Sequence, residues 1–332
     1  MSNTIEEILP KKAKTKKYLV FISIFLSFAF IFCLFVRPAK ISRTLGVSKE
    51  KIAYEATFLN KEDQNPQGVV FNPLIVENNS FPEVSARNAF FVNLTNDEIV
   101  FSKDSKQKVP IASLVKIMTA VVAVEHVKLV SGFPVSQKAA TTGENAMGIS
   151  EGEIYTLEEL LYGLVLNSGN DSAVAIAEGV AGDEENFVSW MNTKAQELGL
   201  LDTKFSDASG LNANEKEYYS TAYDLAVLTE YALNKPVLAK IFSTFEYEIP
   251  WSGKHKYLYL QNQTNLLTTY PGVKGVKTGY TEEAGLCLVT YSENGGQKIL
   301  GVILGSQDRK GDAIILLNYS FDKFGFPVNY PI

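Results

Sequence analysis

The chain has 332 residues, of which 46% are hydrophobic and 20% are charged, a globular composition that excludes disordered and collagen-like proteins. Its formal net charge of −6 argues against a nucleic-acid partner, which would favour a basic surface. The chain has only 2 Cys and 2 His, which excludes a disulfide framework and a cysteine-rich zinc site. A Ser–His–Asp triad would have to use one of these two histidines. We therefore expect chemistry that uses neither a metal nor a cofactor.

A long apolar segment near the N-terminus predicts a membrane anchor. Residues 18–36 carry no charged side chain, and a helix needs about 20 apolar residues to cross a bilayer. A cleavable signal peptide is the alternative, but its apolar core is shorter, and Arg-Pro-Ala-Lys at 37–40 is a poor cleavage site. Basic residues flank both ends of the segment almost equally, so the expected function decides the orientation. We predict a cytoplasmic tail over 1–17 and a single transmembrane helix over 18–36.

Residues 37–81 are predicted to form a linker or stalk, because they contain several turn signals and no sustained helical period. Dense patterning follows and predicts a catalytic domain over 82–332. A hairpin is expected from 89–92 and 98–101. Apolar spacing and capping signals predict helices over 112–127, 156–165, 171–180, 184–198, 221–233 and 312–324. Strands are predicted in the last third over 245–249, 257–261, 275–281, 286–291 and 298–304.

This order of elements predicts an α/β (α+β) fold. Strands at both ends of the patterned region, with helices between them, favour one antiparallel sheet of about five strands. The N-terminal hairpin would complete one edge of that sheet. The helices would cover the sheet and form a second, helical lobe.

Three short motifs occur in order: Ser113-Leu-Val-Lys116, Ser168-Gly-Asn170 and Lys277-Thr-Gly279. Other copies of Ser-x-x-Lys, at 48–51 and 105–108, lie in polar surroundings typical of solvated loops. Ser113 instead opens a predicted amphipathic helix, so Lys116 should lie one turn further along the same face. The N-terminus of a helix also favours developing negative charge.

The motifs suggest a serine nucleophile that is activated by lysine. A serine hydroxyl is a poor nucleophile until a base takes its proton, and burial beside another cation would lower the pKa of Lys116 enough for that task. Lys277 could supply the second cation if the third motif folds beside the first. On this hypothesis Ser168 bridges the lysines and passes a proton to the leaving group, while Asn170 fixes Lys116 and the substrate amide.

The third motif is predicted to hold the end of the substrate. Thr278 would bind a substrate carboxylate, and Gly279 would let the strand approach the substrate backbone without a Cβ in the way. The backbone N–H groups of Ser113 and Tyr280 would form an oxyanion hole.

As a set, these motifs resemble those of the serine-type D-alanyl-D-alanine carboxypeptidases, which are low-molecular-weight penicillin-binding proteins of the β-lactamase/DD-peptidase fold. The similarity runs from about residue 85 to 326 and is carried by 111–120, 160–171, 187–192, 208–211, 219–224 and 275–281.

The resemblance implies a nucleophilic Ser113, a basic Lys116, a proton relay at Ser168 and substrate contacts from Lys277 and Thr278. It also implies peptidoglycan stem peptides as substrate, β-lactam antibiotics as covalent inhibitors, and a catalytic domain outside the bacterial cell membrane. Two departures affect substrate preference: Lys274 stands where relatives often carry an acid, and Gln263 lies near a position where some carry an arginine.

Several alternatives share the same scaffold. A β-lactamase could take its water-holding glutamate from Glu-x-x-Leu-Asn at 230–234, although a solvated helix face explains that segment better. A DD-endopeptidase or transpeptidase would use the same site. A catalytically dead wall-binding protein is disfavoured, because both lysines and both serines are intact. Asp171 and Asp224 are interpreted as helix-start residues, and Cys287 as an inert buried thiol.

Overall fold

The computed structural model describes residues 71–72, 81–211, 218–264, 266–328 and 330. The predicted tail and transmembrane helix, residues 1–36, and nearly all of the predicted linker lie outside this part of the chain. Within it, no helix has both the length and the apolar character needed to cross a bilayer.

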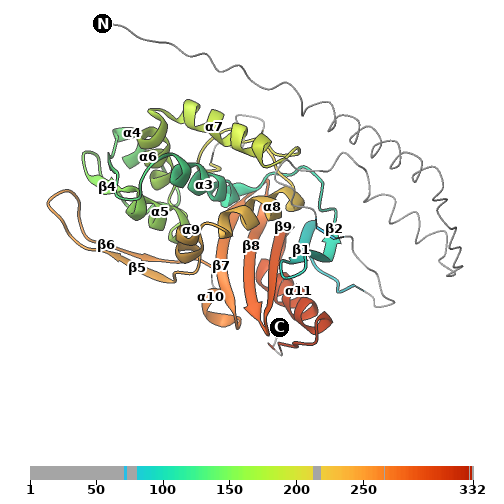
Figure 1. Ribbon diagram of the computed structural model, residues 1–332. Coiled ribbons are helices and arrows are strands. Elements are labelled where there is room, and N and C mark those ends of the chain that lie inside the picture. The colour runs from blue at the N-terminus through green and yellow to red at the C-terminus, as the bar shows by residue number, and fades with distance from the viewer. Residues whose placement is uncertain (1–70, 73–80, 212–217, 265, 329, 331–332) are drawn as a thin grey trace, which may run out of the picture. The chain divides into compact units, whose positions relative to one another are not determined.

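A five-stranded antiparallel sheet in the order β2-β1-β9-β8-β7 forms the centre of the fold (Figure 1). The N-terminal hairpin supplies one edge, as predicted, because β1 pairs with the much later β9. That pairing sets Phe91 opposite Gly301, where the aromatic ring occupies the space that a Cβ would need. The five strands are β1 (Asn88–Asn93), β2 (Glu98–Lys103), β7 (Val273–Thr281), β8 (Gly285–Asn294) and β9 (Gln297–Ser306).

Both faces of the sheet are covered, and each cover has its own hydrophobic cluster. Successive strand side chains point to opposite faces, so Phe90 joins the cluster beneath the helical lobe while Phe91 joins the cluster beneath α11 (Arg309–Lys323). Figure 1 shows α11 and α8 (Ala222–Leu233) on opposite faces of the sheet. The predicted α/β architecture with a helical lobe is therefore confirmed.

The helical lobe lies between the two strand segments in sequence. Its helix α5 begins at a capping box in which Thr156 and Glu159 bond reciprocally to each other's backbone, as the sequence predicts. The lobe and its connections comprise η1 (Ala112–Val115), α3 (Lys116–His126), β3 (Gly132–Pro134), α4 (Gln137–Ala140), β4 (Ile154–Thr156), α5 (Leu157–Leu166), α6 (Asn170–Ala181), α7 (Glu184–Glu197) and α9 (Pro236–Phe242).

Three features differ from the expectation or add to it. The helix predicted over 112–127 starts as the 3-10 turn η1 before α3 continues it. The strands predicted at 245–249 and 257–261 form a separate hairpin, β5 (Glu246–Ile249) with β6 (Leu258–Gln261), and do not join the main sheet. The short helix α10 (Leu266–Thr269) lies between that hairpin and β7.

Phe71, which falls within the predicted linker, packs in the core. Its ring centroid lies 5.5 Å from that of Phe90 and 5.6 Å from that of Tyr223. Asn72 pairs with Glu98 as an isolated bridge beside β2. At these two residues the linker segment therefore contributes to the folded body.

Candidate active site

Ser113 lies in the tight turn η1 that leads into α3. The residue before it, Ala112, adopts a left-handed conformation with φ +48°, which costs about 1–2 kcal/mol for a residue with a Cβ. The hydroxyl of Tyr218 stabilises this turn, because it accepts hydrogen bonds from the backbone N–H groups of Ala112 (2.9 Å) and Ile111 (3.2 Å). Backbone strain held in place by a buried side chain is typical of a functional site.

Lys116 is completely buried beside Ser113. Its Nζ donates hydrogen bonds to Ser113 Oγ (2.9 Å), Asn170 Oδ1 (2.7 Å) and the backbone oxygen of Ser209 (2.6 Å). Burial lowers the pKa of Lys116 to about 7, although the carboxylates of Asp207 and two other acids oppose this shift. A neutral amine is therefore accessible near neutral pH, within reach of the serine proton.

The second motif places Ser168 and Asn170 at the start of α6. Ser168 has φ +56°, so it too holds a left-handed conformation that is costly for a residue other than glycine. Its hydroxyl is buried and, in the part of the chain that the structure describes, makes no hydrogen bond. The bridge from Ser168 to the two lysines is thus not formed in this state. An unpartnered buried hydroxyl on a residue with a strained backbone suits a group that acts only when substrate is bound.

Asp171 organises the loop that supports the second motif. Its carboxylate accepts hydrogen bonds from the backbone N–H groups of Met147 (2.9 Å), Gly148 (2.8 Å) and Ile149 (3.2 Å). Asn170 donates two hydrogen bonds to the same loop, from its side-chain Nδ2 to the carbonyl oxygen of Gly143 and from its backbone N–H to that of Asn145. Asp171 does stand in the first turn of α6, but its carboxylate is used to fix this loop rather than to cap the helix alone.

The third motif lies on β7, packed against η1. Lys277 is buried, and its Nζ donates to the backbone oxygen of Thr278 at 3.0 Å. Burial first, then the nearby charges of Lys116 and Arg309, hold the pKa of Lys277 well below its ordinary value. At Lys116 burial is the cause that lowers the pKa, whereas the sequence hypothesis combined burial with the like charge of a second cation.

Two glycines let the backbones of the site approach closely. A Cβ on Gly279 would lie 3.1 Å from the backbone nitrogen of Ser113, so β7 runs directly against the nucleophile turn. A Cβ on Gly210, which has φ +81°, would lie 2.3 Å from the carbonyl oxygen of Ala112. Tyr280 follows Gly279 on β7, and its side chain is 60% exposed.

The structure thus brings the three motifs together, and it adds residues to which sequence reasoning gave no role. Asp207 accepts bonds from the backbone N–H groups of Ser209 and Gly210, which orients the Ser209 carbonyl toward Lys116. Arg309 Nη1 donates to the carbonyl oxygen of Gly279 at 2.8 Å. The only sequence signal for Asp207 is the Asp-x-Ser-Gly turn at 207–210. No local sequence pattern indicates a role for Arg309. The assigned catalytic roles themselves remain predictions.

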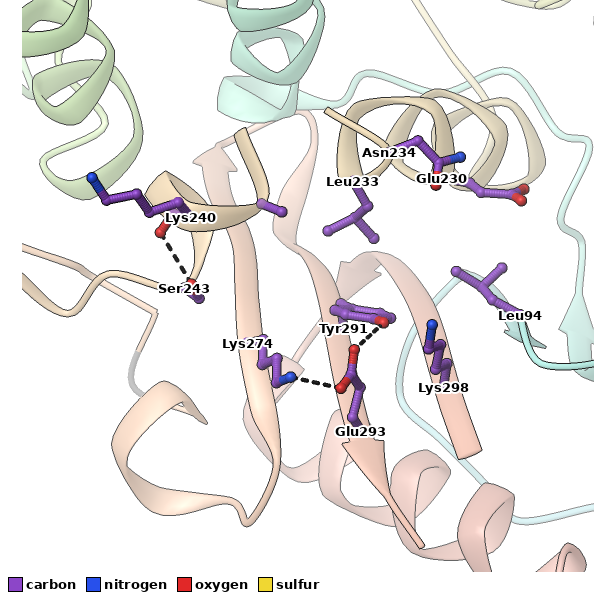
Figure 2. Close-up of a pocket in the computed structure, with 11 residues that line it drawn as sticks. Leu94, Glu230, Leu233, Asn234, Lys240, Ser243, Lys274, Tyr291, Glu293 and Lys298 are labelled. Carbon is purple, nitrogen blue, oxygen red and sulfur yellow. Dashed lines mark hydrogen bonds and ion pairs between the residues drawn. The ribbon is translucent and has the colours of Figure 1, made fainter. Parts of the chain in front are cut away.

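A pocket of about 460 Å³ lies elsewhere, between the ends of α8 and α9 and the sheet, and none of the residues that line it belongs to the three motifs (Figure 2). Lys274 donates to Glu293 there at 2.6 Å. Glu230 also lines this pocket, and burial with the nearby charge of Asp97 raises the pKa of Glu230 to about 7. Glu230 is therefore not placed to hold a water at Ser113, and Lys274 is paired with Glu293 rather than with Lys116 or Lys277.

Known proteins resemble this chain in sequence. Residues 75–308 match the family described as peptidase S11, D-alanyl-D-alanine carboxypeptidase. The D-alanyl-D-alanine carboxypeptidase DacF of Bacillus subtilis is 34% identical over 247 residues, which cover 72% of this chain and 63% of the relative. DacB2 of Mycobacterium tuberculosis is also 34% identical, over 66% of this chain and 74% of the relative. The chain therefore spans less than two thirds of the length of the Bacillus protein.

Solved structures show the same fold. The Streptomyces K15 DD-transpeptidase superposes with a TM-score of 0.70 at 27% sequence identity, covering 74% of this chain and 100% of that one. A D-alanyl-D-alanine carboxypeptidase from Mycobacterium tuberculosis gives a TM-score of 0.70 at 29% identity, over 76% of this chain and 96% of that one. Together with the family match, these similarities confirm the resemblance predicted from the motifs: the chain belongs to the peptidase S11 family of D-alanyl-D-alanine carboxypeptidases.

Proposed function

We propose that this chain is a serine D-Ala-D-Ala carboxypeptidase that removes the terminal D-Ala from peptidoglycan stem pentapeptides. One observation carries the proposal: a fully buried amine of lowered pKa, Lys116 Nζ, hydrogen-bonds both Ser113 Oγ and Asn170 Oδ1. Family membership and the carboxypeptidase names of the relatives from Bacillus and Mycobacterium support the same substrate class.

Acylation begins when neutral Lys116 takes the proton of Ser113 Oγ. The serine oxygen then attacks the carbonyl carbon of the penultimate D-Ala, and the backbone N–H groups of Ser113 and Tyr280 stabilise the resulting oxyanion. The peptide bond breaks as the proton passes to the leaving D-Ala nitrogen, through the otherwise unpartnered hydroxyl of Ser168. Lys277 and Thr278 bind the leaving residue's carboxylate, with the N–H groups of the Lys277 amine and the hydroxyl of Thr278 as hydrogen-bond donors.

Deacylation returns the enzyme to its starting state. A water molecule attacks the ester carbon of acyl-Ser113, and the same base accepts its proton, as microscopic reversibility requires. The oxyanion contacts are reused, and Ser113 Oγ leaves with a proton returned from Lys116. A β-lactam would follow the first half of this path and remain as a stable ester, because its ring-opened product does not depart.

The direct test is release of free D-Ala from a soluble pentapeptide ending in D-Ala-D-Ala, measured with the full chain. The wild type should release D-Ala and be labelled covalently by a fluorescent penicillin, whereas Ser113→Ala should do neither. Labelling of Ser113→Ala at the wild-type rate would contradict the assignment of Ser113 as the nucleophile. Fast hydrolysis of the penicillin, in place of stable labelling, would favour a β-lactamase.

Transpeptidation is a second candidate, because the structurally similar Streptomyces K15 protein is described as a DD-transpeptidase. In that reaction an amine replaces water as the acceptor of the acyl group. Adding an amine acceptor to the pentapeptide assay decides between the two. A product in which the acyl group is joined to the added amine, formed at the expense of hydrolysis, would favour transpeptidation. Hydrolysis alone would favour the carboxypeptidase.

We further propose that residues 18–36 anchor the enzyme in the bacterial cell membrane, with the catalytic domain on the outer side. Their uncharged, apolar sequence is what supports this proposal, together with a substrate that is found outside the cytoplasm. Fractionation of cells expressing the full chain, followed by protease treatment of intact spheroplasts, tests it. Recovery of the protein in the soluble fraction, or protection of the catalytic domain from the protease, would contradict it.

A further inference from the structure

The β5–β6 segment leaves three large aromatic side chains in contact with solvent. Trp251 is 74% exposed, Tyr257 is 50% exposed and Tyr259 is 48% exposed. Single apolar side chains at a protein surface are common, but a group of them within residues 251–259 marks an interaction surface. Aromatic side chains are also enriched where proteins bind ligands, because they offer a large rigid face at low entropic cost.

Strand pairing places one of these aromatic side chains, Tyr259, among polar groups. In the hairpin, Tyr259 pairs with Glu248 and Gln261 pairs with Glu246. Directly paired residues share a face, so these four side chains lie on one face, and all four are exposed. Tyr257 lies two residues before Tyr259 along the chain. We call this set, with Trp251, the outer face of the hairpin.

The opposite face of the hairpin is fixed to the protein. The ring of Tyr247 stacks on Tyr162 with centroids 3.5 Å apart, and Ile249 and Leu260 are fully buried. Figure 1 shows the hairpin extending beside α5, away from the five-stranded sheet. The outer face therefore cannot turn inward to bury its aromatic rings.

The loop that joins β5 and β6 is also fixed to the body of the protein. His255 is buried, its ring stacks on Tyr155 at 4.5 Å, and its Nε2 lies 3.3 Å from a carboxylate oxygen of Glu159. The backbone N–H of Ile154 donates to the carbonyl oxygen of Lys254 at 3.1 Å. Trp251 is thus exposed on an ordered loop, so that binding a ligand there requires little further ordering.

The charge and hydrogen-bonding groups of the hairpin favour a neutral ligand. The strands of the outer face carry Glu246 and Glu248, whereas Lys254 and Lys256 lie in the connecting loop, so the face disfavours a polyanion. Glu246 accepts a hydrogen bond from Gln261 Nε2 at 3.3 Å and still has lone pairs for hydroxyl or amide donors. Flat aromatic faces next to such acceptors match a pyranose ring, which has an apolar C–H face and polar edges.

The chain leaves the hairpin beside the second motif. After β6, the backbone N–H of Gln263 donates to the carbonyl oxygen of Leu166 and its side-chain Nε2 donates to that of Asn167, each at 3.2 Å. Asn167 immediately precedes Ser168. An extended chain rises about 3.3 Å per residue, so Tyr257 can lie about 20 Å from Gln263, and an extended pentapeptide spans a similar distance of about 17 Å.

We propose that the outer face of the β5–β6 hairpin binds a neutral, N-acetylated glycan chain through stacking on Trp251, Tyr257 and Tyr259. Under the proposed function, on which this identification of the ligand rests, the chain is the glycan strand that carries the stem peptides. Holding the glycan would raise the local concentration of stem peptides at Ser113 without any new contact in the catalytic cluster.

The experiment measures co-sedimentation of the full-length protein with insoluble glycan strands whose stem peptides have been removed by an amidase. The wild type and Ser113→Ala should sediment equally. The variants Trp251→Ala and Tyr259→Ala should each weaken binding by about tenfold, as loss of one stacked ring predicts. Leu201→Ala serves as the matched control, because Leu201 is 68% exposed but lies outside the hairpin, and it should bind like the wild type. Circular dichroism checks that every variant is folded.

Two competitors identify the ligand class. Soluble chito-oligosaccharide should displace the protein from the glycan, and added salt or a lysine-rich peptide should not. Failure of the wild type to sediment, wild-type binding by the folded aromatic variants, or displacement by the lysine-rich peptide alone would overturn the proposal. D-Ala release from the soluble pentapeptide is measured in parallel, so that loss of the proposed activity and loss of glycan binding are distinguished.

Discussion

The guanidinium group of Arg309, at the start of α11, donates a 2.8 Å hydrogen bond to the carbonyl oxygen of Gly279 on β7. The same peptide unit carries the N–H of Tyr280, which is one of the two proposed oxyanion donors. A cation bonded to the carbonyl polarises this amide and fixes the end of the strand. A residue distant in sequence from all three motifs is thereby joined to the oxyanion site.

We expect Arg309→Leu to slow acylation by about tenfold to hundredfold, because one oxyanion donor is weakened and β7 is less firmly held. The rate of labelling by a fluorescent penicillin measures this effect. Arg87→Leu is the control, since Arg87 also donates to backbone carbonyls but at residues 283 and 284. Equal rates for the two variants would contradict a specific role for Arg309.

The lowered pKa of Lys116 predicts how acylation depends on pH. Only the neutral amine can accept the Ser113 proton, so the acylation rate should rise as pH passes through about 7 and level off above it. Penicillin labelling rates measured across this range give the apparent pKa. Lys116→Met should abolish the rise together with most of the activity. A wild-type rate that falls as pH increases from 6 to 8 would contradict the assignment of Lys116 as base.

Asp171→Ala should loosen the loop over 143–149 and, with it, Asn170. The substitution removes the acceptor of three loop N–H groups, so we expect the unfolding free energy to fall by about 3 kcal/mol. We also expect the acylation rate to fall, because Asn170 is no longer held in position. Chemical denaturation and penicillin labelling measure the two effects. Asp183→Ala, which removes a helix cap in α7, is the control and should cost about 1 kcal/mol with activity intact. Full activity of Asp171→Ala would show that the loop does not position Asn170.

Glu230 predicts a pH effect on stability that is separate from catalysis. Its pKa is raised in the folded protein, so the stability it contributes is present at low pH and is lost as pH rises through about 7. Glu230→Gln should therefore raise the unfolding free energy at pH 8 by about 1 kcal/mol, a figure reduced for solvent screening, and change little at pH 5. Urea denaturation at the two pH values checks this. Slower penicillin turnover in this variant would instead revive the β-lactamase alternative.

The sequence predicted well those parts of the fold that have local signals. The capping box at Thr156 located the start of α5, and alternating apolar residues located the strands of the sheet. The convergence of the three motifs was predicted because each motif combines residue types that are uninformative singly but chemically complementary as a set. Lysine in two of the three motifs, with hardly any histidine in the chain, pointed to a single kind of base.

Contacts that depend on tertiary structure could not be predicted in the same way. Arg309 meets Gly279 only because α11 packs behind the sheet, and Phe71 enters the core across a long sequence separation. The orientation of the Ser209 carbonyl toward Lys116 depends on an Asp207 turn whose sequence also suits an ordinary loop. The predicted transmembrane segment has a clear sequence signal, but it lies outside the residues that the structure describes.

The main sheet ends at β7, the strand that carries Lys277. A terminal strand has one row of amide groups that no neighbouring strand of the sheet uses, and an extended guest peptide can dock there through its own main chain. Selection would then depend on the guest's stereochemistry and free carboxyl end more than on the bulk of its side chains.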